Sequence, residues 1–335
     1  MIELQQDRLV FRFPDVHRDA TVSVEFQRTL RIPDDGHHYP LPPGFGRFPV
    51  RHVDDFAGRV PERWIEHGGV MLPMYQSEAL WVNFSGSYPC AVKVAAGKID
   101  AVTGKALSAG LARRPQNYLV TPEQPWLDGY CVEQGVIRQF VAMPLGAGYS
   151  AEEQITGEAE YGGLQVVVHP MAAEAYERLR RTRHEHVALL DAMPSMTVTG
   201  AHVALGMGLA PGGRMRQEIF RDPHHLEAWD QEHTNRCFVH LANSLVWRQI
   251  TGHEPPTVPP TAKEYATAGL PWFAYYGAGE SAVEGSGILA KLKSVVQMGT
   301  ATGDAPLPEN ASVTAGPVVE LRKGLAKDEV REGRF

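Results

Sequence analysis

Cysteine is scarce in this chain, and the three cysteines are far apart. Cys90, Cys131 and Cys237 form no CxxC pair, and an odd number of isolated cysteines is a poor basis for a disulfide framework. Free thiols are typical of proteins in a reducing compartment. We therefore predict that the protein has no structural disulfide.

The sequence also lacks a membrane signal, an export signal and a basic surplus. No stretch approaches the roughly 18 apolar residues of a membrane-spanning helix, and residues 1–10 carry acids and glutamines where a signal peptide has a basic and then an apolar run. We therefore expect a soluble, cytoplasmic protein that does not bind membranes. The net charge of −7 argues against a nucleic-acid partner, because phosphate binding usually requires a basic surplus.

Apolar residues are plentiful, at 43% of 335 residues, which is enough for a sizeable core. A chain of this length suggests roughly two domains. The 33 glycines and 25 prolines are scattered rather than repeated, and scattered turn-forming residues predict many short elements.

Alternation of apolar and polar residues predicts strands through most of the first half. Val22, Val24 and Phe26, for example, alternate with polar neighbours, as in a strand with one buried face. The fold class predicted is a β-rich α+β fold, with an antiparallel sheet region followed by a mixed region with packed helices. The predicted divisions are a β-rich domain at 1–170, a helical connector at 171–195, a mixed region at 196–300 and an extended tail at 301–335.

Three more helices are predicted beyond the helical connector. Residues 236–251 are apolar nearly all round, which favours a buried helix that stops at Gly252. Thr261 and Glu264 have the spacing of a capping box, which opens a helix. A further helix is expected over about residues 286–298.

Four glycines form a group that superficially resembles a phosphate-binding loop. These are Gly206, Gly208, Gly212 and Gly213. The third glycine comes one residue too late for the dinucleotide pattern, and the residues that follow alternate as in a strand. We therefore predict a hairpin loop here, and we expect no cofactor.

The strongest chemical cluster spans residues 224–248. If this segment is helical, Cys237 and His240 share one face, and an imidazole beside a thiol can activate it as a catalytic nucleophile. Alternatively, His225, His233 and His240 could meet at a metal ion, although their spacing matches no familiar signature. A third interpretation, which we favour, makes Cys237 and His240 buried core residues.

Aromatic residues gather beside glycine and proline in two segments. Trp126 and Tyr130 lie in one segment, and Trp272 and Tyr275 lie in the other. Core packing is the favoured role for these rings. The alternative is a platform for a ligand or a protein, because Trp and Tyr are enriched at binding hot spots.

Several segments resemble an uncharacterised family of bacterial, fungal and protist proteins. They are Pro125–Gly129, Gly135–Ala142, Gly162–Gln165, Ala210–Gly213 and Thr261–Tyr265. The resemblance covers most of the chain. Some eukaryotic members carry a ubiquitin-like segment, so the resemblance implies a link to ubiquitin-like signalling. It brings no catalytic residues, and we identify no ubiquitin-like segment in this chain.

Two functions follow from these observations. The first is a non-enzymatic binding or assembly protein with a protein partner or self-association, because we recognise no catalytic motif. The second is a thiol- or metal-assisted hydrolase that uses the 224–248 cluster. An enzyme requires these side chains to converge in an open pocket.

Overall fold

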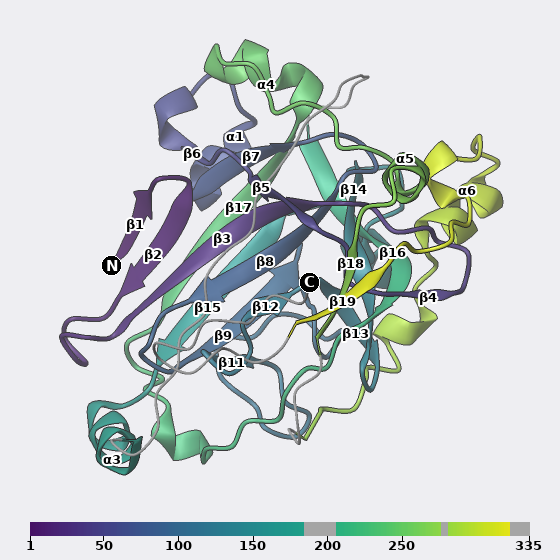
Figure 1. Cartoon of the computed structure of the whole chain (residues 1–335). Coiled ribbons are helices and arrows are strands. Elements are labelled where there is room, and N and C mark those ends of the chain that lie inside the picture. Colours follow the sequence, from purple (N-terminus) through teal and green to yellow (C-terminus); the bar gives the residue numbers. More distant parts are fainter. Residues whose placement is uncertain (184–205, 276–280, 322–335) are drawn as a thin grey trace, which may run out of the picture.

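The computed structural model describes residues 1–183, 206–275 and 281–321, and most of its regular structure is antiparallel β-sheet (Figure 1). The predicted β-rich fold is confirmed at this level. Helices contribute less than the predicted region of packed helices implies, because the six α-helices of the described ranges have only 6 to 11 residues each. None of the helices in these ranges is long and apolar enough to span a membrane.

One layer consists mainly of strands from the N-terminal quarter of the chain. Its main strands, in spatial order, are β1 (Ile2–Gln5), β2 (Arg8–Arg12), β3 (Thr21–Thr29) and β8 (Ala79–Ser85). The shorter strands β5 (Gly44–Arg47) and β12 (Trp126–Leu127) pair with β3 and β8 respectively. All these pairs are antiparallel, so facing residues on neighbouring strands point to the same side of the layer.

A second layer combines strands from distant parts of the sequence. Its main strands, in spatial order, are β9 (Cys90–Ala96), β15 (Leu164–Pro170), β17 (Asn235–Asn243) and β7 (Val70–Met74). Short strands extend its two edges, namely β6 (Arg51–His52), β10 (Ile99–Asp100) and β11 (Leu119–Thr121). β7 runs parallel to β17, whereas the other pairs are antiparallel.

Two strands connect the layers into one continuous sheet. β14 (Val136–Pro144) pairs with β8 and β16 (Gly206–Arg216), and β16 reaches β17. Two further strands attach to this connection, β13 (Gly129–Glu133) on β14 and β4 (His38–Tyr39) on β16. Strands from both sides of residues 171–195 therefore belong to the same sheet.

The main core lies between the two layers. Val22, Val24 and Phe26 of β3 are fully buried there, so the predicted alternation in this strand is confirmed. They share one hydrophobic cluster with Val166 of β15 and Val239 of β17. At roughly 1.5–3 kcal/mol for each fully buried large aliphatic or aromatic side chain, this cluster dominates the favourable side of the folding free energy.

The helices are short additions to the sheet. They are α1 (Glu62–His67), α2 (Ala151–Thr156), α3 (Ala173–Arg183), α4 (Ser244–Thr251), α5 (Ala262–Thr267) and α6 (Val295–Thr302). Single 3₁₀ turns occur at Asp54–Phe56, Leu226–Ala228, Leu289–Lys291 and Pro308–Asn310. The rest of the predicted helical connector, residues 184–195, lies outside the described residues.

The predicted capping box is confirmed at α5. The Thr261 hydroxyl accepts a hydrogen bond from the Glu264 backbone N at 3.2 Å, and the Glu264 carboxylate accepts one from the Thr261 backbone N at 2.8 Å. The prediction of a helix over 286–298 is wrong. That stretch contains only the 3₁₀ turn at 289–291 and the start of α6, which begins after the cap residue Ser294.

The buried helix predicted over 236–251 is also wrong. Its first half belongs to strand β17, and only its second half, α4, is helical. A strand buried on both faces is apolar at nearly every position, as a buried helix is, so the composition could not separate them. The change of structure occurs at Asn243, whose side chain accepts a hydrogen bond from the Leu245 backbone N at 3.0 Å. Gly252 ends α4, as expected.

The predicted glycine-rich hairpin loop is a strand. All four glycines lie within β16, and they allow close packing rather than a turn. A Cβ atom on Gly212 would lie 2.5 Å from Val141 Cγ2, and one on Gly213 would lie 2.2 Å from the Pro33 carbonyl oxygen. Only glycine fits at Gly213, where another backbone approaches so closely, and Gly212 leaves room for the Val141 side chain.

The C-terminal part of the described chain folds back onto the first layer. β18 (Trp272–Tyr275) and β19 (Val318–Leu321) form a parallel pair, so the predicted extended tail contains a strand. Behind them lies a second hydrophobic cluster, made by Leu30, Ile32, Tyr39, Leu41, Phe45, Ile137, Met215, Ala262, Tyr265, Trp272 and Phe273.

Candidate binding face

The outer surface of the first layer presents a group of aromatic side chains. Trp81 on β8 and Trp126 on β12 point away from the main core, and their ring centroids are 6.2 Å apart at 75°. Tyr275 at the end of β18 meets Trp126 edge to face, with centroids 4.8 Å apart at 62°. All three side chains are half-buried, so part of each remains open to solvent. We call Trp81, Trp126 and Tyr275 the aromatic cluster.

A row of hydrogen-bonded polar side chains adjoins this cluster on the same surface. Its centre is Glu25, which accepts hydrogen bonds from Arg47 at 2.9 Å and from the side-chain amides of Gln27 at 3.0 Å and Asn83 at 3.3 Å. Arg8 completes the row, with its Nε 3.6 Å from the Glu25 carboxylate. We call these five residues the polar row. Because these side chains bond to one another through Glu25, they are held in position before any ligand binds.

The strand register explains why these groups lie together. Arg8, Glu25, Asn83 and Trp126 face one another across the four neighbouring strands β2, β3, β8 and β12. Four strands spaced about 4.8 Å apart place the first and last of these residues about 14 Å apart. Together the aromatic cluster and the polar row form one continuous surface, which we call the binding face.

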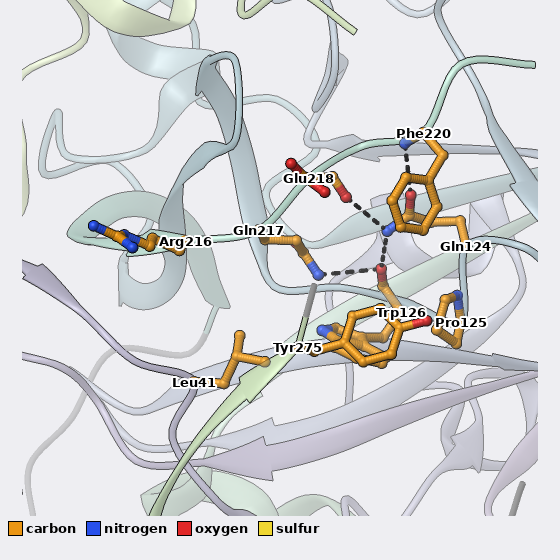
Figure 2. A pocket seen from close by; sticks show the side chains of 9 residues that line it. All are labelled: Leu41, Gln124, Pro125, Trp126, Arg216, Gln217, Glu218, Phe220 and Tyr275. Atoms are coloured by element: carbon orange, nitrogen blue, oxygen red, sulfur yellow. Dashed lines mark hydrogen bonds between the residues drawn. The ribbon is translucent and has the colours of Figure 1, made fainter. Parts of the chain in front are cut away.

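A narrow crevice opens beside the aromatic cluster, as Figure 2 shows. It is lined by Leu41, Gln124, Pro125, Trp126, Arg216, Gln217, Glu218, Phe220 and Tyr275. Its volume is about 10 Å³, which is close to the minimum needed for one water molecule. The crevice is therefore too small for a substrate, and the exposed rings themselves are the accessible feature.

Two buried glutamines hold the backbone beneath the rings (Figure 2). Gln124 donates to the carbonyl oxygens of Trp126 at 3.1 Å and Glu218 at 3.2 Å, and it accepts from the Phe220 backbone N at 2.9 Å. Gln217 also donates to the Trp126 carbonyl oxygen, at 3.3 Å. These bonds fix the position of the Trp126 backbone.

Asp128 lies directly behind this arrangement and is buried. Burial raises the pKa of its carboxyl group to about 7, and an interaction with the Trp126 side chain opposes part of that rise. Near neutral pH, therefore, protonated and ionised forms coexist next to the aromatic cluster.

The four aromatic residues predicted as a platform divide into two pairs. Trp126 and Tyr275 meet in the aromatic cluster. Tyr130 is fully buried and donates from its hydroxyl to the Leu209 carbonyl oxygen at 2.8 Å. Trp272 is also fully buried, in the second hydrophobic cluster. Core packing therefore describes Tyr130 and Trp272, whereas Trp126 and Tyr275 are accessible.

Sequence reasoning missed Trp81 and the polar row. Trp81 lies between Leu80 and Val82, so the alternation on β8 already placed its ring on the outer surface. No sequence pattern indicated the polar row, because the row depends on which residues of separate strands face each other.

The proposed catalytic pair is not brought together. Residues three apart on a strand point to opposite faces, and Cys237 and His240 both lie on β17. Cys237 is in the main core, where burial raises the pKa of its thiol to about 12. His240 stacks on Trp64 at 4.8 Å, donates from Nε2 to the Gly68 carbonyl oxygen, and has a pKa lowered by burial to about 4. A neutral, buried imidazole on the other face cannot activate this thiol.

The three histidines proposed as metal ligands occupy different environments. His225 is exposed beside the 226–228 turn, His233 is exposed and paired with Asp230 at 2.9 Å, and His240 is buried. Within the ranges that the structure describes, no group of three or more His, Cys, Asp or Glu side chains could hold a metal ion.

Comparisons with protein-family models, with curated protein sequences and with solved structures found no significant match to the chain. Any assignment of function therefore rests on the geometry of the chain itself.

Proposed function

We propose that the protein is a non-enzymatic binding protein whose ligand docks on the binding face. The observation that supports this proposal is the aromatic cluster, in which Trp81, Trp126 and Tyr275 are partly exposed beside a fixed row of polar side chains. Aromatic side chains provide large contact areas at a low cost in conformational entropy, which is why they dominate binding hot spots.

The burial of Cys237, the candidate nucleophile, supports binding rather than catalysis. A reactive cysteine requires a lowered pKa and access to solvent, whereas Cys237 is 5% exposed and its thiol pKa is raised by burial. The binding face has a different character, since Glu25 already bonds to three neighbours of the polar row. Its groups are arranged to hold a ligand.

We also propose that the protein acts in the cytoplasm. All three cysteines are free and buried. Free thiols persist where the cell keeps them reduced.

The test is a binding screen on two printed arrays, one of oligosaccharides and one of peptides. Wild-type protein is compared with Trp126→Ala and with Phe238→Ala, which removes a half-buried ring on the outer side of the second layer. We expect ligands that bind wild-type protein and Phe238→Ala but not Trp126→Ala. No ligand on either array, or ligands that bind all three proteins equally, would contradict the proposal.

A further inference from the structure

We infer that the ligand of the binding face is a neutral oligosaccharide. This inference rests on the proposed binding function and adds the chemical class of the ligand. It follows from which hydrogen-bonding atoms the face leaves unused, from the position of the rings beside them, and from the size of the face.

The two side-chain amides of the polar row are oriented by Glu25. A carboxylate only accepts hydrogen bonds, so the NH₂ groups of Gln27 and Asn83 must face it. Their carbonyl oxygens point away from Glu25, and no described residue donates a hydrogen bond to either oxygen. The face therefore presents two fixed acceptors. Donors lie at its far side, on the guanidinium groups of Arg8 and Arg47.

Each of these amides lies beside an indole ring. Gln27 faces Trp81 across β3 and β8, and Asn83 faces Trp126 across β8 and β12. The C–H face of a sugar ring is apolar and slightly positive, so it packs on the electron-rich face of an aromatic ring. Hydroxyl groups at the edge of the same sugar ring would then reach the amide oxygens as donors and the guanidinium groups as acceptors.

This combination of atoms disfavours the other common ligands of aromatic surfaces. A proline-rich peptide docks on aromatic grooves, but its prolines have no N–H to donate, so it would meet the amide oxygens with carbonyl oxygens. A phosphate or carboxylate group would suffer the same repulsion. A hydroxyl group both donates and accepts, and it satisfies both kinds of atom on this face.

The charges and the size of the face agree with a neutral chain of sugars. The Glu25 carboxylate already interacts with both Arg8 and Arg47, so the five residues of the polar row together carry a net charge of only +1. Because the face extends about 14 Å across four strands, it offers room for more than one sugar ring, with one indole for each of two rings. Since the polar row is already ordered, binding would cost little side-chain entropy.

The experiment is titration calorimetry of the whole chain with neutral α- and β-linked glucose hexasaccharides and with the neutral glycans found on the array. We expect saturable binding that is unchanged between 50 mM and 500 mM NaCl. Trp126→Ala should weaken binding about tenfold or more, and Trp126→Phe should retain most of it. Gln27→Met, which removes the whole amide group, its oxygen and the NH₂ that donates to Glu25, while keeping a side chain of similar length, should weaken binding several-fold.

Ser85→Ala is the matched control, because Ser85 lies on the same side of β8 and is exposed outside the binding face. It should bind as wild-type protein does. A melting curve for each variant shows whether it is folded, and Trp126→Phe and Gln27→Met test the inference if Trp126→Ala is not. Binding of peptides or acidic glycans alone, with sensitivity to Trp126→Ala, would overturn the oligosaccharide inference and leave the proposed function standing. Binding to neither array would overturn both.

Discussion

Asp128 and Gln217 exchange two hydrogen bonds beneath the aromatic cluster. The Asp128 backbone N donates to Gln217 Oε1 at 3.0 Å, and Gln217 Nε2 donates to Asp128 Oδ2 at 2.8 Å. Burial raises the pKa of this carboxyl group to about 7, since no cation in the described part of the chain offsets its charge. The Asp128 carboxyl group, which lies beneath the binding face, therefore loses its proton near neutral pH.

This proton makes stability depend on pH. The pKa of Asp128 is about 7 in the folded protein and about 3.9 in an unfolded chain, so its stabilising effect is complete below about pH 4 and is lost as the pH rises through 7. We expect Asp128→Asn to gain free energy of unfolding relative to wild-type protein between pH 5 and pH 8, by up to about 4 kcal/mol. Urea denaturation at each pH measures the difference. A difference that does not change with pH would show that the carboxyl group titrates normally.

A buried ion pair between Arg28 and Glu78 gives a second prediction. The Arg28 Nη2 atom lies 2.7 Å from Glu78 Oε1, and both side chains are almost completely buried. Glu78→Gln would leave the guanidinium charge without its partner, and we expect a loss of about 3–5 kcal/mol. The control is Glu254→Gln, which removes an exposed pair with Arg248 and should change little. Equal effects of the two substitutions in chemical denaturation would refute the prediction.

The third prediction concerns the three thiols. All are buried and unpaired, so we expect three reactive thiols per chain in denaturant without reductant, and slow labelling of Cys237 in the native state. Cys237→Ser places a hydroxyl group in the main core and should cost about 1–3 kcal/mol. A count of one thiol would reveal a disulfide. Fast labelling of Cys237 in the native state, together with an unchanged melting temperature for Cys237→Ser, would instead support a nucleophilic role for Cys237.

The fourth prediction compares two adjacent glycines after α1. Gly68 and Gly69 both have positive φ angles, of 63° and 86°. A Cβ atom on Gly69 would lie 2.2 Å from the Phe238 carbonyl oxygen, whereas one on Gly68 would contact nothing within 4 Å. We expect Gly68→Ala to cost about 1–3 kcal/mol from backbone strain alone and Gly69→Ala to cost clearly more. Similar melting temperatures for the two variants would mean that β17 can move away at no cost.

Local patterns predicted the parts of the fold that depend on neighbouring residues. Val22, Val24 and Phe26 are buried on one side of a strand because the period of two is a property of the strand itself. Thr261 and Glu264 form their capping box within four residues. In both cases the interacting groups are close in sequence, so the sequence carries the necessary information.

Features that depend on distant contacts could not be predicted in the same way. Residues 236–243 contain no period, because both faces of β17 are covered by other parts of the chain. Gly212 and Gly213 look like turn residues until Val141 and Pro33 are seen against them. The binding face has the same origin, since Glu25 meets Asn83 only through the pairing of β3 with β8.

The bridge between Leu41 and Phe273 has a consequence for how the protein is made. The two backbones exchange hydrogen bonds at 2.8 and 2.9 Å, and β18 is completed only by β19, close to the end of the described chain. A ribosome therefore releases Tyr39 and Leu41 long before the residues that cover them exist. Contacts between such distant residues slow folding and leave apolar surface exposed in the meantime. The growing chain should consequently expose these apolar side chains until β19 has emerged.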